Sequence, residues 1–105
     1  MSQYVMLSTT ERYRTVTDNP NLEMMANYDY YFFGKKKTTF SICKIKSQDT
    51  RILIQGVGEV FPDNSIPLKV FPKFETTEEI EKEIYELDID KDSRVVKTEA
   101  QAQPV

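Results

Sequence analysis

Aromatic and β-branched side chains are densest in residues 26–46, ANYDYYFFGKKKTTFSICKIK, and they predict a β-hairpin. Such side chains fit the pleated, half-buried surface of a sheet, and they flank a short segment with Gly34 and three lysines. Glycine supplies the positive φ that a tight reversal requires. We therefore expect two antiparallel strands that meet at a Gly-Lys-Lys tip.

Shorter apolar segments on either side of the hairpin predict further strands. Residues 3–7 and 13–16 favour extended structure, as one bent strand or two short ones. Residues 51–61 predict the next strand, with both of its faces at least partly buried. Residues 66–72 contain two prolines, which cannot donate to a sheet ladder, so this strand belongs at a sheet edge.

Residues 77–88 predict an amphipathic helix. Ile80, Ile84 and Leu87 recur at the spacing of one helix face, and most of the other positions are charged. Thr76, with a glutamate three residues later, has the spacing of a capping box, and acidic residues fill the first turn. We expect the apolar stripe of this helix to cover one face of the sheet.

Two segments have weaker patterns. Residues 22–26, LEMMA, favour helix by propensity but are too short to stand alone, so they predict one helical turn or a loop. Residues 90–105 hold few apolar side chains, so ordering them would not bury enough surface to offset the lost entropy. The expected organisation is one domain over residues 1–89 and a flexible polar tail over residues 90–105.

Together these elements predict an α+β fold. We expect a small, twisted, mostly antiparallel sheet or an open β-barrel of four to six strands. One C-terminal amphipathic helix and a disordered tail complete it.

Composition argues against catalysis. The chain of 105 residues has no histidine, which removes the usual general base at neutral pH and the commonest transition-metal ligand. Cys43 is the single cysteine, so the chain has neither an internal disulfide nor a Cys-rich zinc site. We expect Cys43 to be buried and inert rather than activated by Lys44 and Lys46. These features predict a protein that is not an enzyme and uses no cofactor or metal.

The same composition predicts a soluble, cytoplasmic protein. Apolar residues make up 39% of the chain and charged residues 30%, which is typical of a globular domain. No apolar window approaches the ~20 residues of a membrane span, and the N-terminus does not resemble a signal peptide. A single cysteine is typical of a reducing compartment. We expect no contact with membranes.

Charge is distributed unevenly along the chain. Residues 1–51 contain eight basic and five acidic side chains, so their net charge is +3. The net charge of the whole chain is −3, so residues 52–105 have a net charge of −6. Such asymmetry orients a charged partner. It predicts a small protein-binding module, acting as an accessory subunit, adaptor or inhibitor of a larger protein. The basic hairpin tip and the acidic C-terminal helix would bind, and the partner would present an acidic surface.

The candidate partner-binding residues combine the basic tip, its aromatic neighbours and two strand lysines: Lys35, Lys36, Lys37, Tyr31, Phe33, Lys44 and Lys46. Lysines beside aromatic rings also resemble surfaces that bind single-stranded nucleic acid, which is the alternative function. Stacking on bases requires exposed rings, whereas a protein partner is compatible with rings in the core. We further expect a monomer, or a weak homodimer formed through an unprotected N-terminal strand edge.

Overall fold

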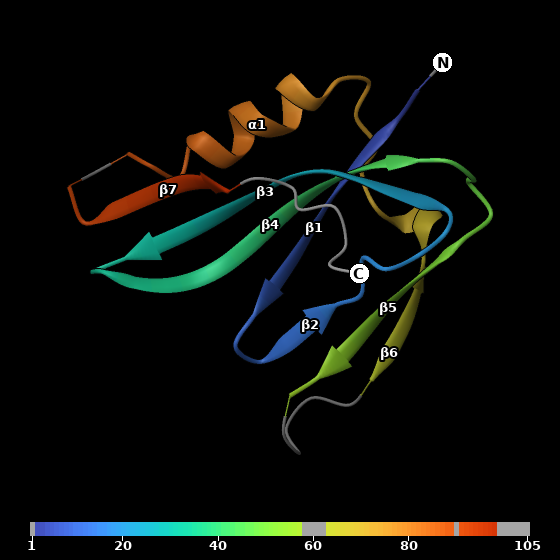
Figure 1. Cartoon of the computed structure of the whole chain (residues 1–105), viewed down its shortest axis with the longest axis horizontal. Helices are drawn as coiled ribbons and strands as arrows, with labels where there is room; N and C mark the ends of the chain where they lie inside the picture. Colours follow the sequence, from blue (N-terminus) through green and yellow to red (C-terminus); the bar gives the residue numbers. More distant parts are fainter. Residues whose placement is uncertain (1, 58–62, 90, 99–105) are drawn as a thin grey trace.

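The computed structural model describes residues 2–57, 63–89 and 91–98, which form two antiparallel sheets and one α-helix (Figure 1). The larger sheet contains, in spatial order, β1 (Tyr4–Thr10), β4 (Lys35–Ile45), β3 (Leu22–Phe32) and β7 (Ser93–Thr98). The smaller sheet contains β2 (Tyr13–Thr15), β5 (Arg51–Gly56) and β6 (Asn64–Pro67). The predicted α+β class is confirmed, and the sheets do not close into a barrel.

The long hairpin is confirmed as β3 and β4, and it is longer than predicted. The expectation of a helical turn or loop at residues 22–26 is wrong, because these residues begin β3. Leu22 lies opposite Ile45 and is buried, so pairing with β4 overrides the local helix propensity. A register shift between Met24 and Ala26 leaves Met25 as an extra, exposed residue, as in a β-bulge.

The reversal between β3 and β4 uses two residues, Phe33 and Gly34, with φ of 52° and 75°. Two successive positive φ values give the turn a twist that matches the strands it joins. The predicted role of Gly34 is confirmed, but Phe33 lies in the turn instead of on the pleated surface. Lys35–Lys37 consequently begin β4 and do not form the tip itself.

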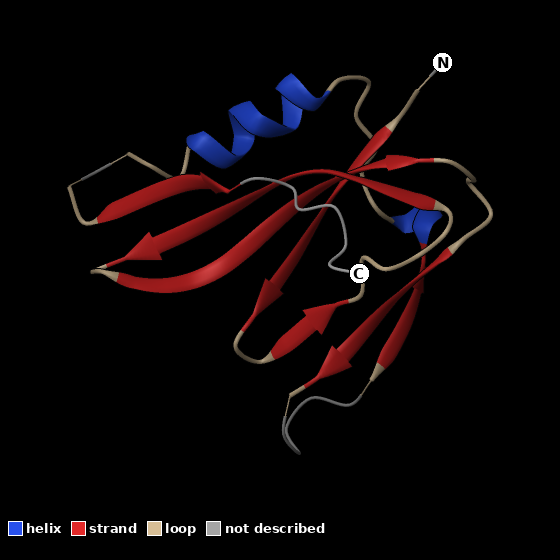
Figure 2. Ribbon diagram, in the orientation of Figure 1, coloured by secondary structure: helices blue, strands red, loops and turns tan. Residues whose placement is uncertain are grey.

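Helix α1 (Thr77–Tyr85) lies over one face of the four-stranded sheet (Figure 2). The Thr76 hydroxyl oxygen accepts a hydrogen bond from the Glu79 backbone N–H at 3.2 Å, which confirms the predicted cap. Ile80 and Ile84 are buried against the sheet. The helix ends before Leu87, which is partly exposed, so the apolar stripe is one residue shorter than expected.

The opposite face of β1 and β4 packs on the three-stranded sheet and on the 3-10 helix η1 (Leu68–Val70). Val5 and Cys43 meet Ile52 and Leu68 in this second cluster, and all four are fully buried. The two faces of β5 are unequally buried, because Ile52 is fully buried whereas Leu53 on the outer face is 42% exposed. The later part of that predicted strand, residues 58–61, lies outside the described residues.

The expectation of a tail without regular structure is wrong for residues 93–98, which form β7 on the outer edge of β3. An edge strand with only one face toward the core buries few side chains, so a strand can form here with few apolar residues. Val95 is the buried apolar residue of β7, at 7% exposed. This strand brings the described total to seven, beyond the four to six predicted. Residue 90 and residues 99–105 lie outside the described part of the chain.

Both expected edge strands exist, and the N-terminal one is partly covered. Tyr4 and Phe74 exchange two backbone hydrogen bonds of 2.8 and 2.9 Å, and the Thr15 hydroxyl donates to the Ser8 carbonyl oxygen. These contacts occupy the backbone groups of Tyr4 and the carbonyl oxygen of Ser8, so the free side of β1 is partly covered. On the other sheet, β6 is an edge strand, as the prolines predict. The predicted strand over residues 66–72 is wrong beyond Pro67, because residues 68–70 form the 3-10 helix η1.

Candidate functional site

The seven predicted binding residues fall into two separate groups. Tyr31, Phe33 and Lys35–Lys37 lie at the turn end of the hairpin, whereas Lys44 and Lys46 lie at or just beyond the other end of β4. Eight residues of extended strand span on the order of 25 Å. The structure therefore does not bring Lys44 and Lys46 to the same site. Lys44 instead lies between Tyr4 and Glu23 in the register of the neighbouring strands.

A row of aligned side chains crosses three strands at the turn end. Lys36 on β4 and Arg94 on β7 are both opposite Tyr31 on β3, so the three share one face of the sheet. The Arg94 guanidinium carbon lies 5.7 Å from the centre of the Tyr31 ring, within cation–π range. Sequence reasoning missed Arg94 because it lies in the segment expected to be disordered; the adjacent Val95–Val96 pair was the only signal of a strand.

Phe33 is an exposed aromatic residue in the turn at this end of the hairpin. Its side chain is 67% exposed, and its ring contacts Phe32 edge-on with centroids 4.4 Å apart. Its backbone N–H donates to the Asp92 carbonyl oxygen at 2.8 Å, which ties the turn to the start of β7. A large aromatic residue at positive φ is unfavourable for folding, and such strain is common at functional sites. We name Tyr31, Phe33, Lys35, Lys36, Lys37 and Arg94 the distal surface.

The lysines of the distal surface are exposed and make no ion pair within the described residues. The ion pair in that part of the chain joins Lys97 to Glu81, at 3.6 Å on the helix side of the sheet. Four positive charges on the distal surface are thus available to an anionic partner.

The acidic helix is a less available surface than the sequence suggests. Glu81 accepts a hydrogen bond from the hydroxyl of buried Tyr28, and burial followed by this hydrogen bond raises the pKa of Tyr28 above its usual value. The glutamates that remain exposed on α1 and at its end are Glu78, Glu79, Glu83 and Glu86.

Cys43 is fully buried, which confirms its expected place in the core. Burial raises the pKa of its thiol to about 12, so the neighbouring lysines do not activate it. Among the residues that the structure describes, no three metal-ligating side chains gather into a group. In that same part of the chain, no helix is long and apolar enough to cross a membrane.

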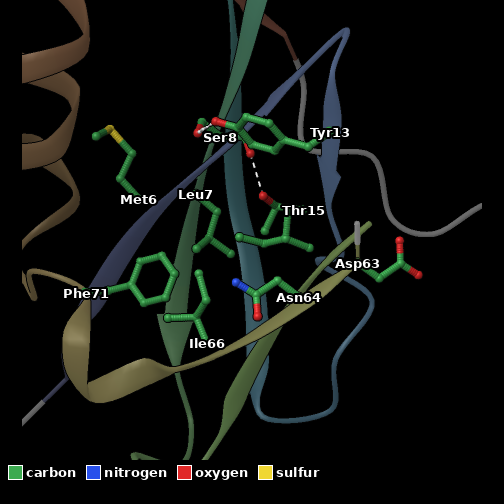
Figure 3. A pocket seen from close by; sticks show the side chains of 10 residues that line it. Met6, Leu7, Ser8, Tyr13, Thr15, Asp63, Asn64, Ile66 and Phe71 are labelled. Atoms are coloured by element: carbon green, nitrogen blue, oxygen red, sulfur yellow. Dashed lines mark hydrogen bonds between the residues drawn. The ribbon is translucent and has the colours of Figure 1, made fainter. Parts of the chain in front are cut away.

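A second site, which sequence reasoning missed, is a half-open cleft of about 640 Å³ between the free side of β1 and the three-stranded sheet (Figure 3). Its lining comes from β1, β2, β5, β6 and the segments flanking β6 and η1: Met6, Leu7, Ser8, Tyr13, Thr15, Ile54, Asp63, Asn64, Ile66 and Phe71. The Ser8 and Tyr13 hydroxyls lie 3.0 Å apart at one end. Residues from so many segments leave no local pattern, so the cleft has no sequence signal.

Comparisons with protein-family models, with curated proteins and with solved structures find no match for this chain. The geometry of the two sites is therefore the basis of the functional argument.

Proposed function

We propose that this chain is a small, non-catalytic protein-binding module whose distal surface binds an acidic segment of a larger protein. The observation that carries the proposal is the exposed Phe33 ring among four cations without ion pairs in the described part of the chain. Aromatic residues and arginine dominate the energetic centres of protein interfaces, and surrounding charges accelerate association.

The position of Phe33 supports the same conclusion. The turn would be more favourable with asparagine before Gly34, because asparagine tolerates positive φ and the Asn-Gly pair suits this turn type. An exposed phenylalanine there lowers stability without filling the core. A binding role for the ring explains why it is present.

The finer parts of the proposal follow from the same features. The protein acts in the cytoplasm as an accessory subunit, adaptor or inhibitor of a larger protein. It is a monomer or a weak homodimer. The exposed glutamates of α1 provide a second, weaker contact surface. A non-catalytic role is supported by Tyr28 and Cys43, which among the described residues have strongly raised pKa values, because burial is the main cause in both and both lie in the core, away from the distal surface.

The experiment compares two double variants with equal charge change on immobilised protein. Lys35→Glu with Lys36→Glu alters the distal surface, and Lys44→Glu with Lys46→Glu alters the other end of the same strand. Proteins captured from the native cell by wild type and by the second variant, but lost with the first, support the proposal. Equal capture by both variants contradicts it, provided that circular dichroism finds both folded.

Phe33 exposure also favours the alternative function, single-stranded nucleic-acid binding, because an exposed ring can stack on a base. Two features weigh against it. Arg94 lies over the half-buried Tyr31 ring, and the C-terminal half of the chain carries −6 and repels a polyanion.

A labelled oligothymidine titration distinguishes the two functions. Nucleic-acid binding predicts affinity that falls steeply with salt, with a slope reduced by about one for each lysine removed. It also predicts a loss of ~1 to ~3 kcal/mol when Phe33 is truncated. Undetectable binding at low salt eliminates this alternative.

A further inference from the structure

The free side of β1 presents one backbone position to the cleft. In an antiparallel pair, alternate residues direct both backbone groups toward the partner strand and the others direct them away. Gln3 accepts a hydrogen bond from Ile45 just beyond the end of β1, whereas Tyr4 bonds to Phe74 on the other side. Met6 therefore directs its N–H and C=O away from β4, as Tyr4 does. The Met6 side chain points toward the helix side (Figure 3), so Met6 faces the cleft with its backbone N–H and C=O.

The ladder that covers Tyr4 cannot extend to Met6. Continuing the register of the Tyr4–Phe74 bridge places Pro72 opposite Met6, and proline has no N–H to donate. The N–H of the preceding residue, Phe71, is already bonded to the Leu68 carbonyl oxygen at 3.0 Å. Two residues further along β1, the Thr15 hydroxyl occupies the Ser8 carbonyl oxygen. Met6 thus lies between Tyr4, whose outward backbone N–H and C=O are already hydrogen-bonded, and Ser8, whose C=O is.

Apolar side chains surround this backbone position. Leu7, Ile66 and Phe71 point toward one another across the cleft, whereas the Asp63 side chain extends away at its rim (Figure 3). Ile54 also lines the cleft. Asp63 also accepts a hydrogen bond from the Gly56 N–H at 2.9 Å, outside the apolar region. The cleft volume lies within the ~300 to ~1,000 Å³ typical of sites for small ligands.

We propose that this cleft binds a free small molecule consisting of one apolar side chain flanked by amides. The ligand N–H and C=O exchange two hydrogen bonds with Met6, as Phe74 does with Tyr4 two residues away. The ligand side chain lies among Leu7, Ile54 and Phe71. A strand of another protein does not fit, because the Tyr4–Phe74 bridge and the Thr15–Ser8 contact leave room to pair only one residue. The site is independent of the distal surface and of its proposed function.

The test uses N-acetyl-leucinamide and its analogue methylated on the acetylated nitrogen, which cannot donate to the Met6 carbonyl oxygen. Each is titrated into ¹⁵N-labelled protein while amide chemical shifts are recorded. We expect saturable shifts centred on Met6 and the cleft residues, with a dissociation constant on the order of 1 mM. Loss of one hydrogen bond should weaken the methylated analogue by about tenfold.

A pair of variants locates the site. Ile66→Trp fills the cleft and should abolish the saturable shifts, whereas Leu53→Trp adds the same group to the exposed face of the neighbouring strand and should leave them unchanged. Equal affinity for both compounds, no saturable shift at Met6, or unchanged binding by a folded Ile66→Trp variant would each overturn the proposal. Tighter binding of a blocked tripeptide, with shifts along the whole of β1, would overturn it in favour of a strand partner. The comparison of the two compounds needs no variant, so it decides the matter even if Ile66→Trp does not fold.

Discussion

The two faces of the four-stranded sheet are covered in different ways, one by a helix and the other by a second sheet. On one face a single helix buries Ile80 and Ile84 against Ile42, leaving all three at most 1% exposed. On the other face a small sheet buries Ile52 and Leu68 but leaves the cleft beside them. The apolar residues of α1 lie on one continuous helix face, whereas the backbone pairing between β1 and the segment before α1 stops at the Tyr4–Phe74 bridge, since Pro72 has no N–H to continue it. The three-stranded sheet therefore leaves space for binding while the core residues beneath it stay buried.

The largest predicted difference between the two covers is in stability. Ile84→Ala removes a fully buried side chain under the helix and should lower the free energy of unfolding by ~2 to ~5 kcal/mol. Ile66→Ala removes a half-buried side chain at the cleft and should lower it by about 1 kcal/mol. Urea denaturation measures both. Equal losses would mean that the cleft side is packed as tightly as the helix side.

The dependence of stability on alkaline pH tests whether water is excluded from the core between the two sheets, where Cys43 lies. Burial raises the pKa of Cys43 from 9.0 to about 12, so the folded state keeps a proton that the unfolded state loses. Stability associated with this thiol is complete below pH 9 and falls as the pH rises toward 12. By pH 10 the loss should be about 1.4 kcal/mol.

The measurement for this prediction is urea denaturation from pH 7 to pH 10. Cys43→Ala is the control, because it lacks the thiol and retains the other titrating groups. The wild type should lose more stability than the variant over this interval. Parallel losses in the two proteins would indicate that water reaches the thiol through the cleft.

The turn of the hairpin offers a change that should affect both covers equally, because β4 contributes to both. Phe33→Asn relieves an aromatic residue at positive φ and should raise the free energy of unfolding by about 1 kcal/mol. Gly34→Ala should lower it by a similar amount, through backbone strain alone, since an added Cβ meets no atom within 4 Å. Hydrogen exchange should change equally at Ile84 and Leu68. A change confined to one side would show that the hairpin end supports that cover only.

The smallest effect is expected at the rim of the helix side. Lys97 forms an ion pair with Glu81, but its side chain is 55% exposed, so solvent screens the interaction. Lys97→Met should change stability by less than about 0.5 kcal/mol in thermal denaturation at low salt. A larger loss would mean that the rim ion pair, and not the burial of Ile80 and Ile84, closes the helix side.

Local signals in the sequence predicted the hairpin, its glycine and the helix with its cap. Each depends on residues a few positions apart, such as Thr76 and Glu79. Strand β7 escaped prediction because its stability comes from pairing with β3, more than 60 residues earlier in the chain. Residues 22–26 were assigned incorrectly for the same reason, since pairing with β4 decides their conformation.

The candidate site divides in the same way. Neighbouring residues in the sequence correctly grouped Tyr31, Phe33 and the three lysines at one end of the sheet. The spacing of Lys44 and Lys46 on an extended strand separates them from that end, and only the register of β7 adds Arg94. The cleft depends on the backbone pairing that stops after the Tyr4–Phe74 bridge, which is a property of the assembled sheets.

The strand order β1-β4-β3-β7 has a consequence for synthesis of the chain. The hairpin can form early because its two strands are adjacent in sequence, but one side of β3 has no partner until β7 emerges some 60 residues later. At ~5 to ~20 residues per second, this interval lasts roughly 3 to 12 s on the ribosome. During that time the aromatic edge around Tyr30 and Phe32 can pair with other nascent chains. The exposed lysines at the start of β4 carry like charges that oppose such pairing, so the same side chains that we propose for partner binding also protect the growing chain.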